Sequence, residues 1–385
     1  MPASSRPPVP FLDLAAQQKR LEPVLRQRLE KVLSHCRFVM GPEVEELERE
    51  LARFSGARHA IGVSSGTDAL LAVMMGEGIG PGDAVFLPAF TYTATAEVVL
   101  LLGATPVFVD VDPDTFQIDP HSLARRLQDV RTNGELTPKA VIGVDLFGQP
   151  APWVRLQAFA ASHNLVLIAD CAQAFGASLN GRRLGTQGLA TTLSFFPAKP
   201  LGAYGDGGAI LTDDDERAAL YRSLRSHGEG QQRYDVQRIG LNARLDTLQA
   251  AVLLAKMELF EEDLARRREV ARLYDAGLPA RVRPPPHVPH SESAWAVYCV
   301  TLPCRAERDS LQHFLREAGV PSAIYYPRPL HHQPAYEKCH DGTLLPVSEG
   351  LGDRVLALPM HPDLTAEDQA RVLEAIGQWD RQASA

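Results

Sequence analysis

Cysteine is scarce in this sequence. Its 385 residues include five cysteines, an odd number without a C-x-x-C pair: Cys36, Cys171, Cys299, Cys304 and Cys339. This spacing indicates neither a disulfide framework nor a zinc-binding pair. Free thiols are typical of a reducing compartment, so we expect a cytoplasmic protein. Cys171 follows an acidic residue, which leaves a redox or nucleophilic role open, but a small buried filler explains it better.

Long apolar runs and excess positive charge are also missing. No run approaches the ~18 apolar residues of a membrane span. Residues 1–20 lack the apolar core of a secretory signal, so we expect no membrane association. The net charge of −8 argues against nucleic acid as the main partner. It does not exclude an anionic substrate, because a basic pocket can lie on an acidic protein.

The order of apolar runs predicts the fold class. From about residue 60 to residue 211, helical patterns alternate with short apolar runs. This alternation is typical of an α/β domain with a mostly parallel sheet. The length exceeds that of a usual single core, so a second domain is expected. Strands are predicted at 84–87, 105–110, 140–146, 165–169, 193–196 and 208–211.

Periodicity also predicts helices and a second unit. Helices are expected over 43–54 and 214–224, with one long helix over 245–273. The polar segment 226–241 is predicted to be a functional loop. A strand at 295–302, a helix at 308–318, a strand at 323–326 and a helix at 365–379 predict a small α+β domain. We therefore divide the chain into 1–255, an arm with the large domain, and 256–385, the small domain.

Lys199 and Asp170 are the first candidate catalytic residues. Lys199 lies on a glycine-rich turn between two predicted buried strands, where desolvation would lower the pKa of its amine. Asp170 ends an apolar strand, and ligands of open α/β sheets bind at the carboxyl ends of the strands. A lysine and an acid so placed suit pyridoxal phosphate, whose aldehyde bonds to the lysine and whose ring nitrogen pairs with the acid. Taken singly, a surface lysine and a turn acid remain open.

A phosphate site is predicted at Ser65-Gly66-Thr67, which leads directly into a helical pattern. The first backbone N–H groups of a helix attract anions. Gly66 would let the backbone approach a phosphate closely. An ordinary Ser or Thr helix cap is the alternative.

Six motifs in order resemble one enzyme family. They are SSGTDAL, PAFTYTAT, ADCAQAFGA, SFFPAKPLGAYGDGGAI, GLNARLDTLQAA and YYPRPLHHQPAY, and the match runs from about Phe11 to near the C-terminus. Together they resemble the DegT/StrS-type nucleotide-sugar aminotransferases, which are pyridoxal phosphate enzymes of fold type I. Within that family, the fourth and fifth motifs are most similar to enzymes of surface-polysaccharide synthesis. Those enzymes aminate C3 of a UDP-linked 2-acetamido-3-keto-hexuronic acid.

The resemblance implies roles for named residues. Lys199 would hold the cofactor and move a proton, and Asp170 would keep its ring nitrogen protonated. Tyr92 would stack on the ring, although a core aromatic is the alternative. The remaining cofactor contacts would be Gly66, Thr67, Gln173, Ser194 and Asn242. Asn242 would reach the partner subunit's cofactor phosphate, which implies a homodimer with shared sites, although it could also cap a helix.

Substrate contacts are implied around Arg244 and the YYPRPLHHQ segment. Arg244 could bind a sugar carboxylate or diphosphate in bidentate fashion. Tyr326, Arg328 and His331 would face the sugar, with Arg328 where an apolar residue is expected. Surface ion pairs are the alternative for both arginines. No metal is predicted from His331 and its neighbour His332, because adjacent side chains rarely converge and no third ligand is evident.

The sequence therefore predicts transfer of an amino group from L-glutamate to a nucleotide-linked keto sugar, with 2-oxoglutarate as the other product. Alternatives remain open. The substrate could be another 3- or 4-keto dTDP- or UDP-sugar or an amino acid, and the reaction could be sugar dehydration. The chain could also be a regulator that only binds cofactor or sugar, or an α/β enzyme without pyridoxal phosphate.

Overall fold

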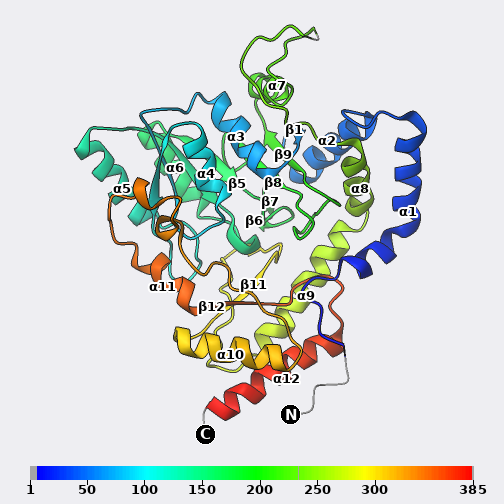
Figure 1. Cartoon of the computed structure of the whole chain (residues 1–385), viewed down its shortest axis with the longest axis vertical. Coiled ribbons are helices and arrows are strands. Elements are labelled where there is room, and N and C mark those ends of the chain that lie inside the picture. The colour runs from blue at the N-terminus through cyan, green and yellow to red at the C-terminus, as the bar shows by residue number, and fades with distance from the viewer. Residues whose placement is uncertain (1–6, 233, 384–385) are drawn as a thin grey trace.

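A seven-stranded sheet forms the centre of the large unit in the computed structural model, which describes residues 7–232 and 234–383 (Figure 1). The strand order is β1-β9-β8-β5-β4-β2-β3. Only β9 runs against its neighbours, and the other strands are parallel to one another. The strands are β1 (His59–Val63), β2 (Asp83–Pro88), β3 (Thr105–Val109), β4 (Thr137–Val144), β5 (Val166–Asp170), β8 (Ala190–Ser194) and β9 (Gly208–Thr212). The predicted mostly parallel sheet is confirmed.

Both faces of the sheet are buried. Alternate residues of β2 belong to different cores: Phe86 packs on one side, and Val85 and Leu87 pack on the other. Helices supply the rest of both cores, as expected for a parallel sheet. They are α2 (Pro42–Ser55), α3 (Gly66–Gly76), α4 (Ala94–Leu101), α5 (Pro120–Asn133), α6 (Trp153–His163) and α7 (Asp215–Leu224). This arrangement brings the carboxyl ends of the parallel strands to one edge.

The long helix expected over 245–273 is wrong. Two helices, α8 (Thr247–Met257) and α9 (Phe260–Gly277), meet at a turn formed by Glu258 and Leu259. The physical reason is packing. The turn lets Phe260 stack on Phe175 at 5.5 Å between ring centroids, while α8 contacts α1 and α2. One straight helix could not bury both apolar faces.

A smaller unit lies at the lower end of Figure 1 and contains β11 (Tyr298–Thr301), β12 (Val355–Leu358), α10 (Arg305–Glu317) and α12 (Ala366–Ala383). Its core consists mostly of aliphatic side chains and includes the rings of Tyr274 and Tyr298, whose centroids lie 4.9 Å apart. The strand expected at 323–326 is wrong. Only Ala323 bridges Ala357 there, and Pro321 and Pro327, which lack N–H donors, flank it. The domain boundary after residue 255 stays a prediction.

The N-terminal arm connects both units. Helix α1 (Leu14–His35) runs along α8, where Leu21 and Leu25 pack with Val252 and Ala255. Before it, Val9 is buried in the core of the smaller unit and donates a backbone hydrogen bond to Gly319 O at 2.9 Å.

The remaining elements are short. They are β6 (Ser178–Leu179), β7 (Arg182–Arg183), β10 (Ser291–Glu292), α11 (Pro346–Arg354) and the 3-10 turns η1 (Leu146–Gly148), η2 (Leu330–His332) and η3 (Glu337–Cys339). The predicted loop 226–241 has neither helix nor strand among its described residues and projects above α7 in Figure 1. No helix in the described ranges has the length and apolarity needed to cross a bilayer.

Candidate active site

Asp170 lies at the carboxyl end of β5 and is 6% exposed. Its carboxylate accepts hydrogen bonds from Thr95 Oγ1 and from the backbone N–H of Ala172, each at 3.1 Å. Burial raises the pKa of Asp170, and these two donors together with the positive charge of Lys199 oppose that rise. The three contacts stabilise the ionised form of the acid.

Lys199 lies on the turn after β8, the strand next to β5. The turn is held by hydrogen bonds from Lys199 N to Phe196 O at 2.8 Å and from Ala203 N to Phe195 O at 2.7 Å. Burial lowers the pKa of the Lys199 amine, while the charge of Asp170 acts in the opposite direction. The structure therefore brings the predicted lysine and acid into electrostatic contact, with a lysine that loses its proton more readily than an exposed one.

The start of α3 lies beside the end of β8. Ser65 caps the helix by accepting a hydrogen bond from Asp68 N at 3.0 Å, so the capping role falls on Ser65 rather than on Thr67. Gly66 is the first helical residue, and a Cβ added there would lie 2.7 Å from Ser194 Cβ. Only glycine therefore fits, and three predicted cofactor contacts, Gly66, Thr67 and Ser194, meet in one place.

Gln173, Tyr326 and Tyr92 form a second group near Asp170. Gln173 Nε2 donates to the Tyr326 hydroxyl at 3.1 Å, and Gln173 Oε1 accepts from Phe147 N at 2.6 Å. Burial raises the pKa of Tyr326 well above neutrality. The Tyr92 ring lies 6.4 Å from the Tyr326 ring and is 55% exposed, which excludes a core aromatic.

Arg244 and Asn242 lie on the strand-like segment before α8. The backbone of Arg244 forms an isolated β-bridge with Val63, and the Nε atom of Arg244 is buried without a hydrogen-bond partner. Asn242 is exposed and bridges Ser226; the cap of α8 is Asp246, so Asn242 does not cap that helix. Among the described residues, neither Arg244 nor the exposed Arg328 forms an ion pair, which argues against surface salt bridging for both.

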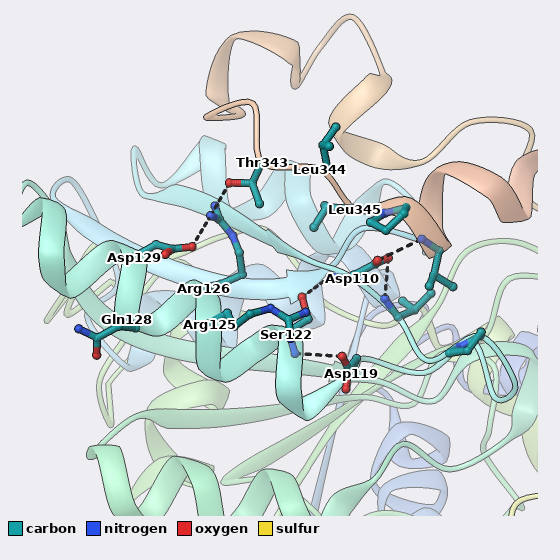
Figure 2. Close-up of a pocket in the computed structure, with 14 residues that line it drawn as sticks. Asp110, Asp119, Ser122, Arg125, Arg126, Gln128, Asp129, Thr343, Leu344 and Leu345 are labelled. Atoms are coloured by element: carbon teal, nitrogen blue, oxygen red, sulfur yellow. Dashed lines mark hydrogen bonds and ion pairs between the residues drawn. The ribbon is translucent and has the colours of Figure 1, made fainter.

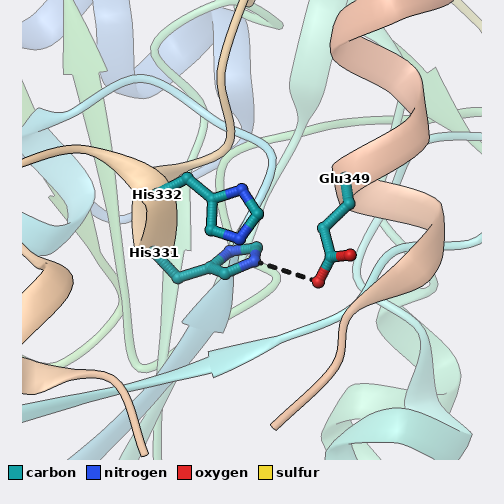
Figure 3. A group of neighbouring side chains, drawn as sticks. All are labelled: His331, His332 and Glu349. Carbon is teal, nitrogen blue, oxygen red and sulfur yellow. Dashed lines mark hydrogen bonds and ion pairs between the residues drawn. The ribbon is translucent and has the colours of Figure 1, made fainter. Parts of the chain in front are cut away.

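His331 is buried and does have a third potential ligand nearby, which the sequence did not reveal (Figure 3). Its Nε2 lies 3.4 Å from Glu349 Oε1, and Glu349 also accepts from Leu345 N at 2.9 Å. The ligand atoms of His331, His332 and Glu349 spread over up to 4.8 Å. Two ligands of tetrahedral zinc lie only about 3.3 Å apart, so this is the geometry of a hydrogen-bonded His331–Glu349 pair. Burial lowers the pKa of His331 to about 4.

Asp145 is a site residue that the sequence analysis missed. It follows β4, is fully buried, and donates its backbone N–H to Asp170 O at 2.9 Å. Burial raises its pKa to about 7. Its neighbour Cys171 is buried with a pKa raised by burial, which supports the filler interpretation. The available signal was that Asp145, like Asp170, comes directly after a run of apolar residues, although the predicted strand 140–146 included it.

A cavity of about 470 Å³ lies elsewhere, between α5 and the segment 343–347 (Figure 2). Several of its polar groups form hydrogen bonds with one another or with nearby residues. Arg126 donates to Asp129, Thr343 and Asp341, and Asp110 accepts from Ser348. Neither Lys199 nor Asp170 lines this cavity, so it is separate from the candidate active site.

Comparisons with known proteins agree with this geometry. The chain is 45% identical over 92% of its length to UDP-2-acetamido-2-deoxy-3-oxo-D-glucuronate aminotransferase of Pseudomonas aeruginosa, of which it covers 96%. It is also similar to a DegT DnrJ EryC1 StrS aminotransferase structure from Brucella abortus, with a TM-score of 0.94, 45% identity, and coverage of 96% of this chain and 99% of that one.

A further structure, NtdA from Bacillus subtilis with bound cofactor PMP, gives a TM-score of 0.85 at 28% identity. It covers 97% of this chain and 83% of that one. Residues 20–377 match the DegT/DnrJ/EryC1/StrS aminotransferase family. The chain belongs to the DegT/DnrJ/EryC1/StrS aminotransferase family.

Proposed function

We propose that this chain uses pyridoxal phosphate to transfer an amino group from L-glutamate to C3 of UDP-2-acetamido-2-deoxy-3-keto-hexuronic acid. The observation that carries the proposal is the electrostatic pairing of Lys199 and Asp170 at the carboxyl edge of the sheet. The sugar follows from the 45% identity to an aminotransferase named for that uronate.

The residues fit the cofactor. Pyridoxal phosphate, when bound, supplies an aldehyde that bonds to a lysine amine and a ring that takes up an electron pair. The free N–H groups at the start of α3 suit its phosphate, and the contact between Gly66 and Ser194 leaves no Cβ in the way. Asp170, with hydrogen bonds to both carboxylate oxygens, suits its positively charged ring nitrogen.

Each side chain then has a chemical task. Lys199 would hold the aldehyde carbon and would then move a proton between that carbon and C3 of the sugar, for which its lowered pKa is suitable. Asp170, as a carboxylate, would hold the ring nitrogen in its protonated form. Gln173, fixed by Phe147 and Tyr326, would contact the ring and help to orient it. Tyr92, which is largely exposed in this single chain, is available to cover the ring face.

Arg244 supports an acidic sugar. A guanidinium whose buried Nε has no partner is costly unless an anion meets it. A hexuronate carboxylate supplies two oxygens for such a group. Tyr326, Arg328 and His331 come from the same segment and would complete the sugar side, with His331 held by Glu349.

The enzyme works as a homodimer with shared sites in this proposal. The projecting segment 226–241 and the exposed Asn242 are the surfaces that would reach the partner subunit's cofactor phosphate. Tyr234 and Ile239 in that segment are 78% and 84% exposed, as expected for apolar side chains that a second copy covers. The free thiols support a cytoplasmic location.

The decisive experiment is a titration of the glutamate-loaded enzyme with a panel of UDP- and dTDP-linked keto sugars. We expect each subunit to transfer one amino group to the UDP-3-keto-hexuronate. Mass spectrometry of the sugar and the absorbance of the cofactor measure this transfer. Preferred transfer to a neutral 3- or 4-keto sugar would reject the proposed substrate but would support the aminotransferase activity. Loss of water from the sugar would indicate a dehydratase, and binding without transfer would indicate a regulator.

A further inference from the structure

The segment 330–336 is hydrogen-bonded at both of its ends to the segment that follows β2. The backbone N–H of Leu330 donates to Ala89 O at 2.8 Å. At the other end, the Tyr336 hydroxyl donates to Thr93 O at 3.3 Å and is also hydrogen-bonded to Thr93 Oγ1. Tyr336 and Thr93 are 243 residues apart in the chain, so their contact exists only in the folded protein.

The Tyr336 side chain is buried, with 4% exposed, and its ring packs edge-on against Phe108 with 6.2 Å between the centroids. A buried tyrosine hydroxyl needs a hydrogen-bond partner, because leaving it without one costs free energy. Since the Tyr336 proton goes to the Thr93 carbonyl, the Thr93 hydroxyl supplies the proton of the second bond. Each hydroxyl therefore satisfies the other.

Thr93 is the N-cap residue of α4, but its side chain does not cap that helix. A threonine at this position ordinarily accepts a hydrogen bond from one of the first helical N–H groups. Here its hydroxyl bonds to Tyr336 instead. The Thr93 carbonyl accepts from Ala96 N at 2.9 Å and from Glu97 N at 3.0 Å. The Tyr336 hydroxyl is a third donor to the same oxygen, so a residue from outside the helix holds its start.

Two residues of the candidate active site flank Thr93. Tyr92 precedes it, and the exposed Tyr92 ring lies 6.4 Å from the Tyr326 ring. Thr95, the second residue of α4, donates to Asp170 Oδ2 at 3.1 Å. Because rigid peptide planes join neighbouring residues, a shift of Thr93 would displace both of them.

We propose that Tyr336 is a positioning residue for the transamination: through Thr93 it fixes the start of α4. This keeps Tyr92 available to the cofactor ring and keeps the Thr95 hydroxyl against Asp170. The inference rests on the proposed function. Tyr336 ends the segment proposed to face the sugar, so its hydroxyl also connects that segment to the cofactor side of the site.

The test compares wild type with Tyr336→Phe, which keeps the ring and removes both hydrogen bonds to Thr93. Amide hydrogen exchange of residues 92–101 should be faster in the cofactor-free variant. We expect the variant to bind pyridoxal phosphate about fivefold more weakly, and its kcat to fall roughly fivefold to tenfold. The circular dichroism of the bound cofactor, which reports the surroundings of its ring, should change as well.

Tyr274→Phe is the matched control. It also removes a hydrogen bond from a buried tyrosine hydroxyl to a backbone carbonyl, that of Pro359 at 3.0 Å, but in the smaller unit. This variant should leave cofactor binding, the circular dichroism and the exchange of residues 92–101 unchanged. A merely structural loss of one buried hydrogen bond would affect both tyrosine variants alike.

Changes at Thr93 test the contact from its other side. Thr93→Val removes the hydroxyl and should reproduce the effects of Tyr336→Phe in weaker form, because the carbonyl acceptor remains. Thr93→Ser keeps the hydroxyl and should behave as wild type. The double variant Thr93→Val/Tyr336→Phe should be no worse than Tyr336→Phe alone, since both changes remove the same contact.

Unchanged cofactor binding and circular dichroism in Tyr336→Phe, or equal changes in Tyr274→Phe, would overturn the inference. Unaltered exchange of residues 92–101 in Tyr336→Phe would overturn it too. Wild-type protein that binds no pyridoxal phosphate would instead reject the proposed function, and the exchange measurement on cofactor-free protein does not depend on that outcome.

Discussion

The side-chain amide of Gln173 donates a hydrogen bond to the hydroxyl of Tyr326, 3.1 Å away, and so joins the segment after β5 to the segment that precedes η2. The contact is half-buried, and the backbone of Phe147 fixes the other end of the amide. It connects the proposed cofactor side of the site to the proposed sugar side.

Breaking this contact should slow the reaction without unfolding the protein. Tyr326→Phe and Gln173→Ala each remove the hydrogen bond, and neutral hydrogen bonds are worth about 1 kcal/mol. We expect kcat/KM to fall roughly fivefold to tenfold in each variant. The double variant should lose less than the product of the two effects, because both changes remove the same contact. Fully multiplicative losses would show that the two residues act independently.

Lys199→Ala should abolish turnover while leaving the cofactor able to bind. Nucleophile and proton carrier are lost together, so kcat should fall by several orders of magnitude. Single-turnover assays and cofactor absorbance measure this. Near-normal turnover would end the assignment of Lys199.

Asp170→Asn keeps the shape of the side chain and removes its charge. The ring nitrogen would then lose its proton, and kcat should fall by more than about tenfold, a barrier increase above ~1.4 kcal/mol. Activity measured at saturating pyridoxal phosphate separates this effect from weaker cofactor binding. A variant that keeps wild-type kcat would make Asp170 a structural residue.

Shared sites predict rescue between inactive variants. Mixed dimers of Lys199→Ala and Asn242→Ala/Arg244→Ala subunits should contain one intact site each, giving about a quarter of wild-type activity per site after random exchange. Subunit exchange itself can be followed with differently tagged chains. Exchange without recovered activity would reject the composite site.

The same Arg244 change tests the sugar. Removing the buried partner of a carboxylate costs roughly 2–5 kcal/mol of binding free energy. Arg244→Ala should therefore reduce activity on the 3-keto-hexuronate far more than on a neutral keto sugar. Equal losses of activity on both sugars would reject the assignment of Arg244 as the carboxylate contact. They would not contradict the proposed aminotransferase activity.

Asp145 also predicts a pH dependence of stability. Its pKa rises from 3.8 in the unfolded chain to about 7 in the folded one. Below the lower value both states are protonated. Between the two values only the unfolded state releases the proton, so stability falls as the pH rises, and above the upper value the penalty is constant. Asp145→Asn should remove this penalty, gaining roughly 3 kcal/mol more at pH 8 than at pH 5 in urea unfolding.

Much of this architecture could be predicted from the chain itself. Strands such as β5 are continuous apolar runs buried on both faces, and such runs are identified by composition alone. Lys199 and Asp170 were identifiable because each interrupts or ends such a run. The break at Glu258–Leu259 was not, because both helices have good helical residues throughout and only the tertiary position of Phe260 requires the turn.

The partners of site residues were harder to foresee than the residues themselves. Glu349 meets His331 only through the packing of α11 against η2, and no spacing in the sequence encodes that contact. Asp145 was equally hard to predict as a site residue. Its one feature in the sequence is that it is an acid after an apolar run, and several other acids share that feature. What distinguishes it is an unpartnered oxygen, which exists only in three dimensions.

Two connections between the smaller unit and the rest of the chain lie close to its core, in addition to the pairing of β10 with β6. One is the continuous passage from α8 through Glu258 into α9. The other is the segment before α1, where Val9 is bonded to Gly319 and the carbonyl of Pro10 accepts from His361 Nε2 at 3.2 Å. A body held by a single connection can rotate freely about it, whereas one held at several separated points cannot rotate about any one of them. Shortening the arm would therefore remove one restraint on the smaller unit without changing any residue of the candidate active site.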